Sequence, residues 1–292
     1  MTTTLIVGCG YLGRRVGRKL SLRSERVLGT TRSEAKAADL AGRGVEPVVA
    51  DVLDPSSLRR LPEADRALYC VGFDRSAGVP MRSLSMDGLR NVLEALAGRV
   101  SKLVYTSSTS VYGIDDGGWV DEDSPTEPKT ESGLVGLDAE RRAQDFCDRQ
   151  GIECVVMRSS GLYGPGRLIR REALKRGEPI VGDPSKYLNL IHIDDAASAA
   201  VAALDRGVSG RVYLATDDRP IERREYYTLA ASLIGGPEPR FVVRDPKSLE
   251  EANKRVSNRR IKAELGLTLA YPDIRTGLPA TIVEEKSLSH GV

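Results

Sequence analysis

A glycine-rich turn near the start of the chain has the residue types and spacing that suit a pyrophosphate group. Gly8-Cys-Gly-Tyr-Leu-Gly13 follows the pattern G-x-G-x-x-G, directly after an apolar segment and directly before a segment with helical periodicity. Gly8 permits a tight turn, Gly10 lets the backbone approach the ligand, and Gly13 lets the helix pack closely on the strand. The free N–H groups and the dipole of the helix N-terminus favour an anion there. We therefore predict a dinucleotide site at Gly8, Gly10, Tyr11, Leu12 and Gly13, rather than a turn without a ligand.

The residues after the next two apolar segments bear on which dinucleotide is bound. An acidic residue about 20 positions beyond the motif typically binds the ribose 2′-hydroxyl of NAD, whereas arginine there accommodates the 2′-phosphate of NADP. This chain has Arg32-Ser33 at that point, and both side chains suit a phosphate. We expect NADP, and NAD stays open because a shifted turn would bring Glu34 to the ribose. Asp51, after the third apolar segment, either accepts a hydrogen bond from the adenine amino group or caps a loop.

These residues are positioned by segments that alternate between strand and helix character. The apolar segment 4–7 is typical of a buried strand, and Leu12, Val16 and Leu20 then recur on one face of a helix. Further strand-like segments span 26–31, 45–50, 67–71, 102–107 and 154–157, with 212–215 as another candidate, and helical patterns span 33–40, 54–58, 85–97 and 137–149. This alternation, with continuously apolar strands, predicts an α/β fold with a Rossmann-type, doubly wound parallel sheet.

The second half of the chain is less regular. Residues 113–133 are rich in Gly, Asp, Pro, Ser and Glu and predict a loop, and residues 159–187 predict a second irregular region. Helical patterns return at 223–234 and 247–265. We divide the chain into an NAD(P)-binding domain over 1–158 and a smaller substrate-binding lobe over 159–292, with some segments of the lobe returning to the Rossmann core.

The composition argues against several classes of partner and site. With 43 basic and 41 acidic residues the net charge is +2, so the sequence carries no electrostatic footprint for nucleic acid. No apolar run approaches the roughly 18 residues that cross a bilayer, and the N-terminus lacks the pattern of a signal peptide. The four cysteines form no C-x-x-C pair and predict free thiols in a cytoplasmic protein, and two histidines do not support a His-based metal site.

Five landmarks follow one another along the chain. After the glycine motif come Gly88-x-x-Asn-Val-Leu-Glu-Ala95, Val104-Tyr-Thr-Ser-Ser-Thr-Ser-Val-Tyr-Gly113, Arg158-x-x-x-x-Tyr-Gly-Pro-Gly166 and Ile191-His-Ile-Asp-Asp195. In this order they resemble the extended short-chain dehydrogenase/reductases, also called the NAD-dependent epimerase/dehydratase family, over most of the chain. The resemblance implies a Rossmann core with a smaller C-terminal substrate lobe, a cleft between them, a small-molecule substrate, and a homodimer formed through two helices that flank the sheet. The glycine spacing departs from the family's usual G-x-x-G-x-x-G.

The active-site pattern departs further from the family, which uses a Tyr-x-x-x-Lys pair as its general acid/base. The resemblance places Ser132 at the tyrosine position, Gly136 at the lysine position, and Ser85 where the family has a catalytic asparagine. Ser108 keeps the family's serine, four residues before Tyr112. Ser108 and Ser132 are therefore the candidate catalytic residues, although a serine hydroxyl without a neighbouring cation is a poor proton donor.

Four other side chains could take part in the chemistry, and three of them are better explained by structure. Tyr112 and Tyr163 match tyrosines that the family already has beside a working Tyr–Lys pair, so a structural role is favoured for both. The family resemblance assigns His192 to a segment that packs between the lobes. Trp119, the only tryptophan, lies in the polar loop after the serine strand and either covers a substrate or packs on the rim of the cleft.

Two functions follow from these residues. The first is an NADP-dependent oxidoreductase or epimerase-like enzyme with a modified proton relay, acting on a sugar nucleotide or a small carbonyl compound. The second is a non-catalytic NADP(H)-binding redox sensor or regulator. The retained framework around Ser108 favours the first, and the loss of both the tyrosine and the lysine favours the second.

Overall fold

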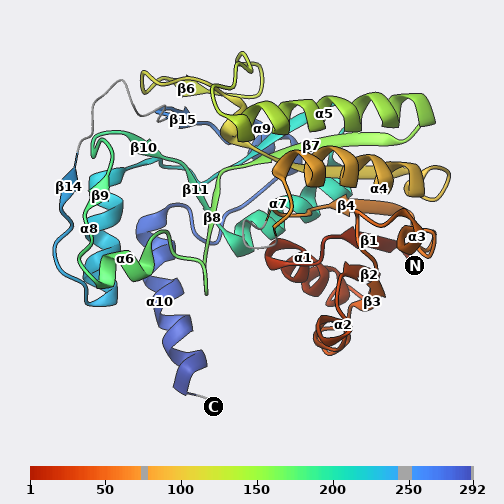
Figure 1. Cartoon of the computed structure of the whole chain (residues 1–292), viewed down its shortest axis with the longest axis horizontal. Coiled ribbons are helices and arrows are strands. Elements are labelled where there is room, and N and C mark those ends of the chain that lie inside the picture. The colour runs from red at the N-terminus through yellow and green to blue at the C-terminus, as the bar shows by residue number, and fades with distance from the viewer. Residues whose placement is uncertain (74–77, 243–251, 291–292) are drawn as a thin grey trace.

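Seven parallel strands form the central sheet of the computed structural model, which describes residues 1–73, 78–242 and 252–290. In spatial order they are β12 (Val212–Ala215), β7 (Glu153–Ser159), β5 (Lys102–Ser108), β4 (Arg66–Tyr69), β1 (Thr3–Val7), β2 (Arg26–Thr31) and β3 (Glu46–Val49). Every neighbouring pair is parallel, so all carboxyl ends lie at one edge (Figure 1). The chain order reverses between β1 and β4, which is where ligands bind in such sheets. The predicted α/β class with a doubly wound parallel sheet is confirmed.

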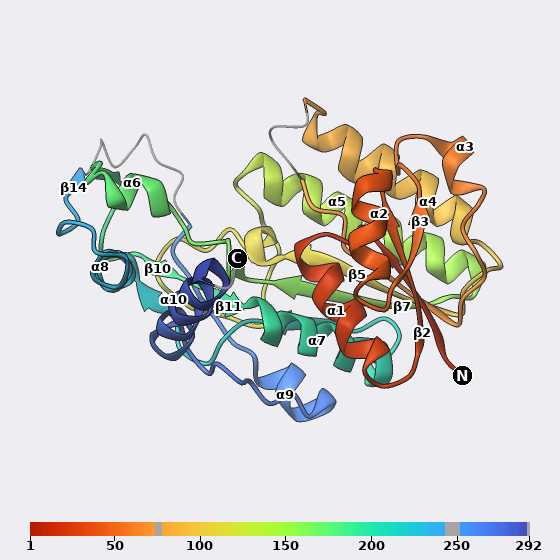
Figure 2. The ribbon, with the colours of Figure 1, turned by 90° about the horizontal axis from the view of Figure 1, so that it is seen from below.

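Helices cover both faces of this sheet. Figure 2 shows α1 (Tyr11–Ser21) and α7 (Ile193–Arg206) on one face, and α4 (Leu89–Leu96) and α5 (Glu131–Gln150) on the other. The helical face predicted from Leu12, Val16 and Leu20 is buried against the sheet. α7 carries a run of buried alanines, which lets it approach β-strands and α1 closely. Apolar clusters therefore cover the sheet on both faces, one under α1 and α7 and the other under α4 and α5.

Shorter elements make the connections near the carboxyl edge. After β2 and β3 come α2 (Glu34–Ala41) and α3 (Pro55–Leu58), each with a side-chain N-cap, Ser33 and Asp54. Between β4 and β6 (Trp119–Val120) lie the π-helical turn η2 (Ser83–Gly88) and the 3₁₀ turn η3 (Thr109–Val111).

The elements on the left of Figure 1 form a smaller group beside the sheet, which we call the peripheral lobe. Its elements are β8 (Gly161–Tyr163), α6 (Arg171–Lys175), β9 (Ile180–Val181), β10 (Tyr187–Leu188), β11 (Leu190–His192), β13 (Ile221–Glu222), α8 (Arg223–Ile234), β14 (Phe241–Val242) and α10 (Ile274–His290). A separate apolar core holds them together. Although they follow residue 158, α7 and β12 belong to the sheet and its covering layer, whereas the exact division at 158 stays a prediction. In the described ranges, no helix is both long and apolar enough to cross a membrane.

Two element predictions were wrong in part. Over the described residues 252–265, the helix predicted over 247–265 covers only α9 (Arg259–Leu265), because β15 (Arg255–Val256) pairs with β6 instead. Residues 247–251 lie outside the described ranges. The loop predicted over 113–133 contains β6, and α5 begins at Glu131 rather than near 137. Thr130 caps this helix by accepting a hydrogen bond from the Gly133 N–H, and this cap extends the helix through the polar stretch.

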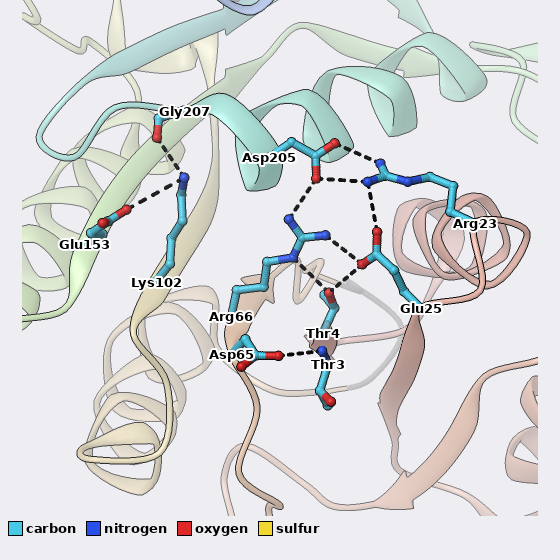
Figure 3. Close-up of polar contacts among 10 residues, drawn as sticks. All are labelled: Thr3, Thr4, Arg23, Glu25, Asp65, Arg66, Lys102, Glu153, Asp205 and Gly207. Atoms are coloured by element: carbon cyan, nitrogen blue, oxygen red, sulfur yellow. Dashed lines mark hydrogen bonds and ion pairs between the residues drawn. The ribbon is translucent and has the colours of Figure 1, made fainter. Parts of the chain in front are cut away.

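A network of charged side chains closes the opposite, amino-terminal edge of the sheet (Figure 3). Arg66 on β4 donates to Glu25 and to Asp205, each at 2.7 Å, and also to the Thr4 hydroxyl at 3.0 Å. Arg23 pairs with the same two carboxylates. Burial raises the pKa of Asp205, but hydrogen bonds from Arg23 and Arg66 outweigh it and lower the pKa overall. This edge is therefore specialised for stability, away from the ligand edge.

We expect Arg66→Met to lower the free energy of unfolding by about 2–4 kcal/mol, because it leaves two half-buried carboxylates with one cation. The control Arg26→Met breaks an exposed pair with Glu46 and should cost much less, because solvent screens the pair. Urea denaturation followed by circular dichroism measures both. Because the Asp205 pKa is lowered, the wild-type advantage should be present at neutral pH and shrink as the pH falls below about 4. Equal losses in the two variants would contradict a stabilising network.

Candidate functional site

The glycine turn between β1 and α1 contains two glycines that close packing requires and one that is accessible. Gly8 has a φ of +88°, and a Cβ there would lie 2.8 Å from the Val71 backbone. A Cβ on Gly13 would lie 2.9 Å from the Gly8 carbonyl oxygen. A Cβ on Gly10 would meet nothing closer than 4.0 Å. Gly8 and Gly13 are therefore required by packing, whereas Gly10 faces open space that a ligand can enter.

The N-terminus of α1 is open to an anion. Its first internal hydrogen bond runs from the Arg14 N–H to the Gly10 carbonyl at 3.0 Å, and no side chain caps the helix. No acidic residue lies in the first turn, and no acceptor within the described residues takes the N–H groups of Tyr11, Leu12 or Gly13. Free amides and the positive end of the dipole beside open space fit a pyrophosphate group.

The carboxyl end of β2 presents a free cation next to a helix cap. Arg32 is exposed, and within the described residues no carboxylate pairs with it. The Ser33 Oγ accepts a hydrogen bond from the Lys36 N–H at 3.2 Å and so caps α2, while its own proton is left to donate. Glu34 is the exposed first residue of α2. The structure thus places Arg32 and Ser33 together at the strand end, as the sequence predicted, and leaves Glu34 one position further along.

Asp51 has the loop-capping role that the sequence left open. Its Oδ1 accepts a hydrogen bond from the Leu53 N–H at 2.9 Å. Its own N–H donates to the Ser57 hydroxyl at 3.0 Å, so the loop is tied at both sides. The second carboxylate oxygen has no recorded partner among the described residues. It is left to accept from a ligand, so the two roles are compatible.

Serine hydroxyls gather at the carboxyl ends of β5 and β7. Ser108 is exposed at the end of β5, and its Oγ accepts from the Ser110 N–H at 3.1 Å, which leaves the hydroxyl proton free to donate. In the sheet register Ser108 lies opposite Ser159. The Oγ atoms of Ser159 and Ser160 are buried without a hydrogen-bond partner in the described part of the chain. These two serines were missed from the sequence because they resemble ordinary small residues that end a strand.

The positions matched to the family's tyrosine and lysine carry no titratable group. Ser132 is exposed in the first turn of α5, with its hydroxyl 3.2 Å from that of Thr130. A Cβ on Gly136 would meet only the Val111 side chain, at 3.8 Å, so space stays open beside the helix. Ser85 is half-buried within η2. The structure therefore brings Ser132 to the start of the helix, but no proton donor stronger than a hydroxyl comes from these three positions.

A buried ion pair beneath Ser108 was also missed. Arg158 on β7 and Glu140 on α5 are joined by hydrogen bonds of 2.7 to 3.2 Å, with side chains only 7% and 2% exposed. The Ser107 hydroxyl donates to Glu140, and Arg158 donates to the Tyr112 hydroxyl at 2.7 Å. Burial raises the pKa of Tyr112 to about 12. The network locks the end of β5 to α5 and gives Tyr112 a structural role.

Tyr163 and His192 are fully buried, away from solvent. The His192 Nδ1 accepts a hydrogen bond from the Asp194 N–H at 3.2 Å, and its ring lies 5.2 Å from Tyr163 and 4.0 Å from Tyr271. Burial lowers the pKa of His192 to about 4, so the ring is neutral. These contacts fit the packing role that the family resemblance assigned to His192.

Trp119 lies on the surface beside a buried lysine that the sequence did not reveal. The ring is 53% exposed, and the Arg255 guanidinium lies 5.2 Å from its centre. Lys254 is 5% exposed, and its Nζ donates to the Tyr112 carbonyl at 2.9 Å. Burial lowers the pKa of Lys254 to about 8. Trp119 thus packs on one side and stays open on the other.

Comparison with known proteins places this geometry in a family. The model of the NAD dependent epimerase/dehydratase family matches residues 4–215. Protein YeeZ of Escherichia coli (strain K12) is 31% identical over 282 residues, which cover 94% of this chain and 97% of YeeZ. A dTDP-glucose 4,6-dehydratase of Streptomyces griseus is 27% identical over 248 residues, which cover 80% of this chain and 75% of that protein.

A solved structure shows the same fold over the whole length. A conserved protein of unknown function from Silicibacter pomeroyi is 31% identical to this chain, with a TM-score of 0.78 over 97% of this chain and 99% of that one. The family match runs from β1 to the end of β12, so it includes the glycine turn and the Ser108 strand. The chain therefore belongs to the NAD-dependent epimerase/dehydratase family.

Proposed function

We propose that this chain is an NADP-dependent oxidoreductase or epimerase-like enzyme that acts on a sugar nucleotide or a small carbonyl compound. The observation that carries the proposal is the glycine turn, in which Gly10 opens onto an uncapped helix N-terminus at the same sheet edge as Ser108. The description of the family as NAD-dependent supports a nicotinamide cofactor. The name of the Streptomyces griseus relative supports a sugar nucleotide as the substrate class.

Each candidate residue has one role in this proposal. The N–H groups of Tyr11, Leu12 and Gly13 hold the pyrophosphate, and the accessible Gly10 lets it approach. Arg32 and Ser33 hold the 2′-phosphate through charge-assisted hydrogen bonds. The free oxygen of Asp51 accepts from the adenine amino group. Bound at this edge, the cofactor supplies hydride chemistry.

On the substrate side, the serines act as hydrogen-bond donors to a carbonyl oxygen. Ser108 retains a free hydroxyl proton, and Ser159 lies opposite it in the register. Ser132 is a weaker candidate because it is exposed at the start of α5. A serine hydroxyl is a poor acid, so the proton that the alkoxide takes up must come from a donor other than the family's Tyr–Lys pair.

We expect the protein to bind NADPH more tightly than NADH, and Arg32→Ala to remove this preference. Loss of charge-assisted contacts to the 2′-phosphate should weaken NADPH about 10- to 100-fold while leaving NADH unchanged. Isothermal titration of wild type, Arg32→Ala and the control Arg18→Ala, which removes an exposed cation further along α1, measures this directly. Tighter binding of NADH would move the ribose contact to a carboxylate such as Glu34.

A non-catalytic redox sensor is the second candidate, and the absence of a titratable group at Ser132 and Gly136 favours it. A sensor should bind the cofactor tightly without turnover, and a partner's affinity should change with the cofactor's redox state. Oxidation of NADPH by the wild type across a panel of sugar nucleotides and carbonyl compounds, reduced in Ser108→Ala, would exclude it. A partner bound equally with NADP, NADPH or no cofactor would also exclude it.

We also propose that two copies associate through the outer face of α4 and α5. A groove of about 660 Å³ lies between these helices. It is lined by side chains of both signs, including Arg90, Glu94, Arg141 and Asp145, which a second copy related by a twofold axis can pair with its own opposite charges. Light scattering should give twice the chain mass of 31.7 kDa, and Arg141→Glu should favour the monomer. A monomeric wild type at 100 µM would contradict this.

A further inference from the structure

Tyr11, the first residue of α1, joins the glycine turn to the peripheral lobe. Its hydroxyl donates to the Pro165 carbonyl at 3.1 Å. Burial raises the pKa of Tyr11 to about 12, so the hydroxyl keeps its proton and donates at neutral pH. Its ring lies 4.7 Å from the Arg15 guanidinium and 5.5 Å from that of Arg167. Tyr11 therefore brings segment 164–167, far away in the sequence, to the entrance of the cofactor site.

Segment 164–167 is held in one conformation from two sides. The backbones of Gly164 and Arg167 exchange hydrogen bonds of 3.3 and 2.9 Å, which close a tight turn. A Cβ on Gly164 would lie 2.8 Å from the Tyr11 hydroxyl, so the turn packs directly on α1. On the other side, the Gly166 N–H donates to Glu285 of α10 at 2.7 Å. The position of Arg167 is thus fixed by contacts that do not involve its own side chain.

The charges around Tyr11 do not balance. Arg15 pairs with Asp194 at 3.0 Å, and Arg171 pairs with Glu285. In the described ranges, the exposed Arg167 has no carboxylate partner, and its guanidinium lies over the ring of Tyr11. A cation without a counter-ion therefore stands beside the open N-terminus of α1. Guanidinium and phosphate form strong bidentate contacts, so an unpaired arginine at this place suits a phosphate ligand.

We propose that Arg167 is a phosphate ligand of the cofactor site, and that its guanidinium closes over the pyrophosphate held at the N-terminus of α1. This inference rests on the proposed function, because it assumes a dinucleotide at the glycine turn. It assigns the pyrophosphate to a cation from the peripheral lobe and the 2′-phosphate to Arg32 at the end of β2. Dinucleotide binding then ties the peripheral lobe to the Rossmann sheet through one side chain.

The test compares two probes that share adenosine but differ in their phosphates. ADP-ribose carries the pyrophosphate, whereas 2′-AMP carries only the phosphate that Arg32 is proposed to hold. By isothermal titration of the full chain, we expect Arg167→Ala to weaken ADP-ribose about tenfold or more and to leave 2′-AMP unchanged. Arg167→Lys should recover part of the loss, because it keeps the charge without the bidentate fork. The control Arg18→Ala should change neither probe.

Three outcomes would overturn the assignment. Unchanged ADP-ribose binding in Arg167→Ala would remove this inference alone, provided the wild type binds ADP-ribose. Equal weakening of ADP-ribose and 2′-AMP would show a general charge effect rather than a pyrophosphate contact. A folded wild type that binds neither ADP-ribose nor NADPH would overturn the proposed function, and this inference with it. Thermal unfolding of each variant confirms that the exposed substitution leaves the fold intact.

Discussion

Replacing Gly10 with glutamate is expected to weaken dinucleotide binding at least about 100-fold, which corresponds to about 2.7 kcal/mol. A Cβ at this position has 4.0 Å of clearance, so the new side chain has room to extend into the open space beside α1. There its carboxylate occupies the anion site and repels the pyrophosphate, while the helix dipole accepts it without penalty. Binding is measured by isothermal titration with NADPH, and stability by thermal unfolding.

Two further glycine variants separate the effect of charge from the effect of packing. Gly10→Ala adds a Cβ in open space without the charge, so its comparison with Gly10→Glu isolates the carboxylate. Gly13→Val, in contrast, should lower stability as well as binding, because its Cβ meets the Gly8 carbonyl at 2.9 Å. NADPH binding by Gly10→Glu at wild-type affinity would show that the cofactor does not use this turn.

The glycine turn was predictable because every part of its signal is local. Strand, turn and helix follow one another within the first 21 residues, and the periodicity of Leu12, Val16 and Leu20 identifies the buried face of α1. The parallel, doubly wound character of the sheet followed from the alternation of strands and helices and from the handedness of crossovers. Local patterns of this kind also located Arg32, which directly follows a strand.

The buried ion pair was not predictable in the same way. Glu140 lies among Asp138, Arg141 and Arg142, so the sequence reads as the solvated face of a helix. Its partner Arg158 is 18 residues further on, on another strand. Which charge of such a run turns inward is decided by the packing of α5 on β5 and β7, and nothing local encodes it. The burial of Lys254 was missed for a related reason, because its partner, the Tyr112 carbonyl, lies 142 residues away in the sequence.

The wrongly extended helix shows tertiary context overriding propensity. The residues before α9 include good helix formers, yet Arg255 and Val256 pair with Trp119 and Val120. The side-chain oxygen of Asn253 accepts a hydrogen bond from the Tyr187 N–H at 3.0 Å. The backbone carbonyl of Asn253 accepts one from the Gly117 N–H at 2.8 Å. These contacts satisfy backbone groups that a helix would otherwise satisfy internally. They also turn Lys254 inward, to the Tyr112 carbonyl.

Replacing Glu140 with glutamine is expected to lower the free energy of unfolding by about 3–5 kcal/mol, because it leaves the Arg158 charge buried without a counter-ion. The substitution keeps the volume of the side chain, so the loss reports on charge rather than on a cavity. Asp148→Asn is the matched control, since it removes an exposed carboxylate from the same helix and should cost less than about 0.5 kcal/mol. Urea denaturation followed by circular dichroism measures both variants.

A double variant tests whether the pair contributes through mutual compensation or through each side chain separately. Glu140→Leu combined with Arg158→Met removes both charges, so it should be considerably more stable than Glu140→Gln, even though it makes more changes. It should also leave the hydroxyls of Ser107 and Tyr112 without their partners, which predicts that some of the loss persists. If the double variant lost as much stability as its two single variants together, the two side chains would contribute separately rather than by mutual compensation. If the double variant were as stable as the wild type, the pair would matter mainly for holding the end of β5, and with it Ser108, in a fixed position. The double variant should then be stable but show reduced NADPH-dependent turnover.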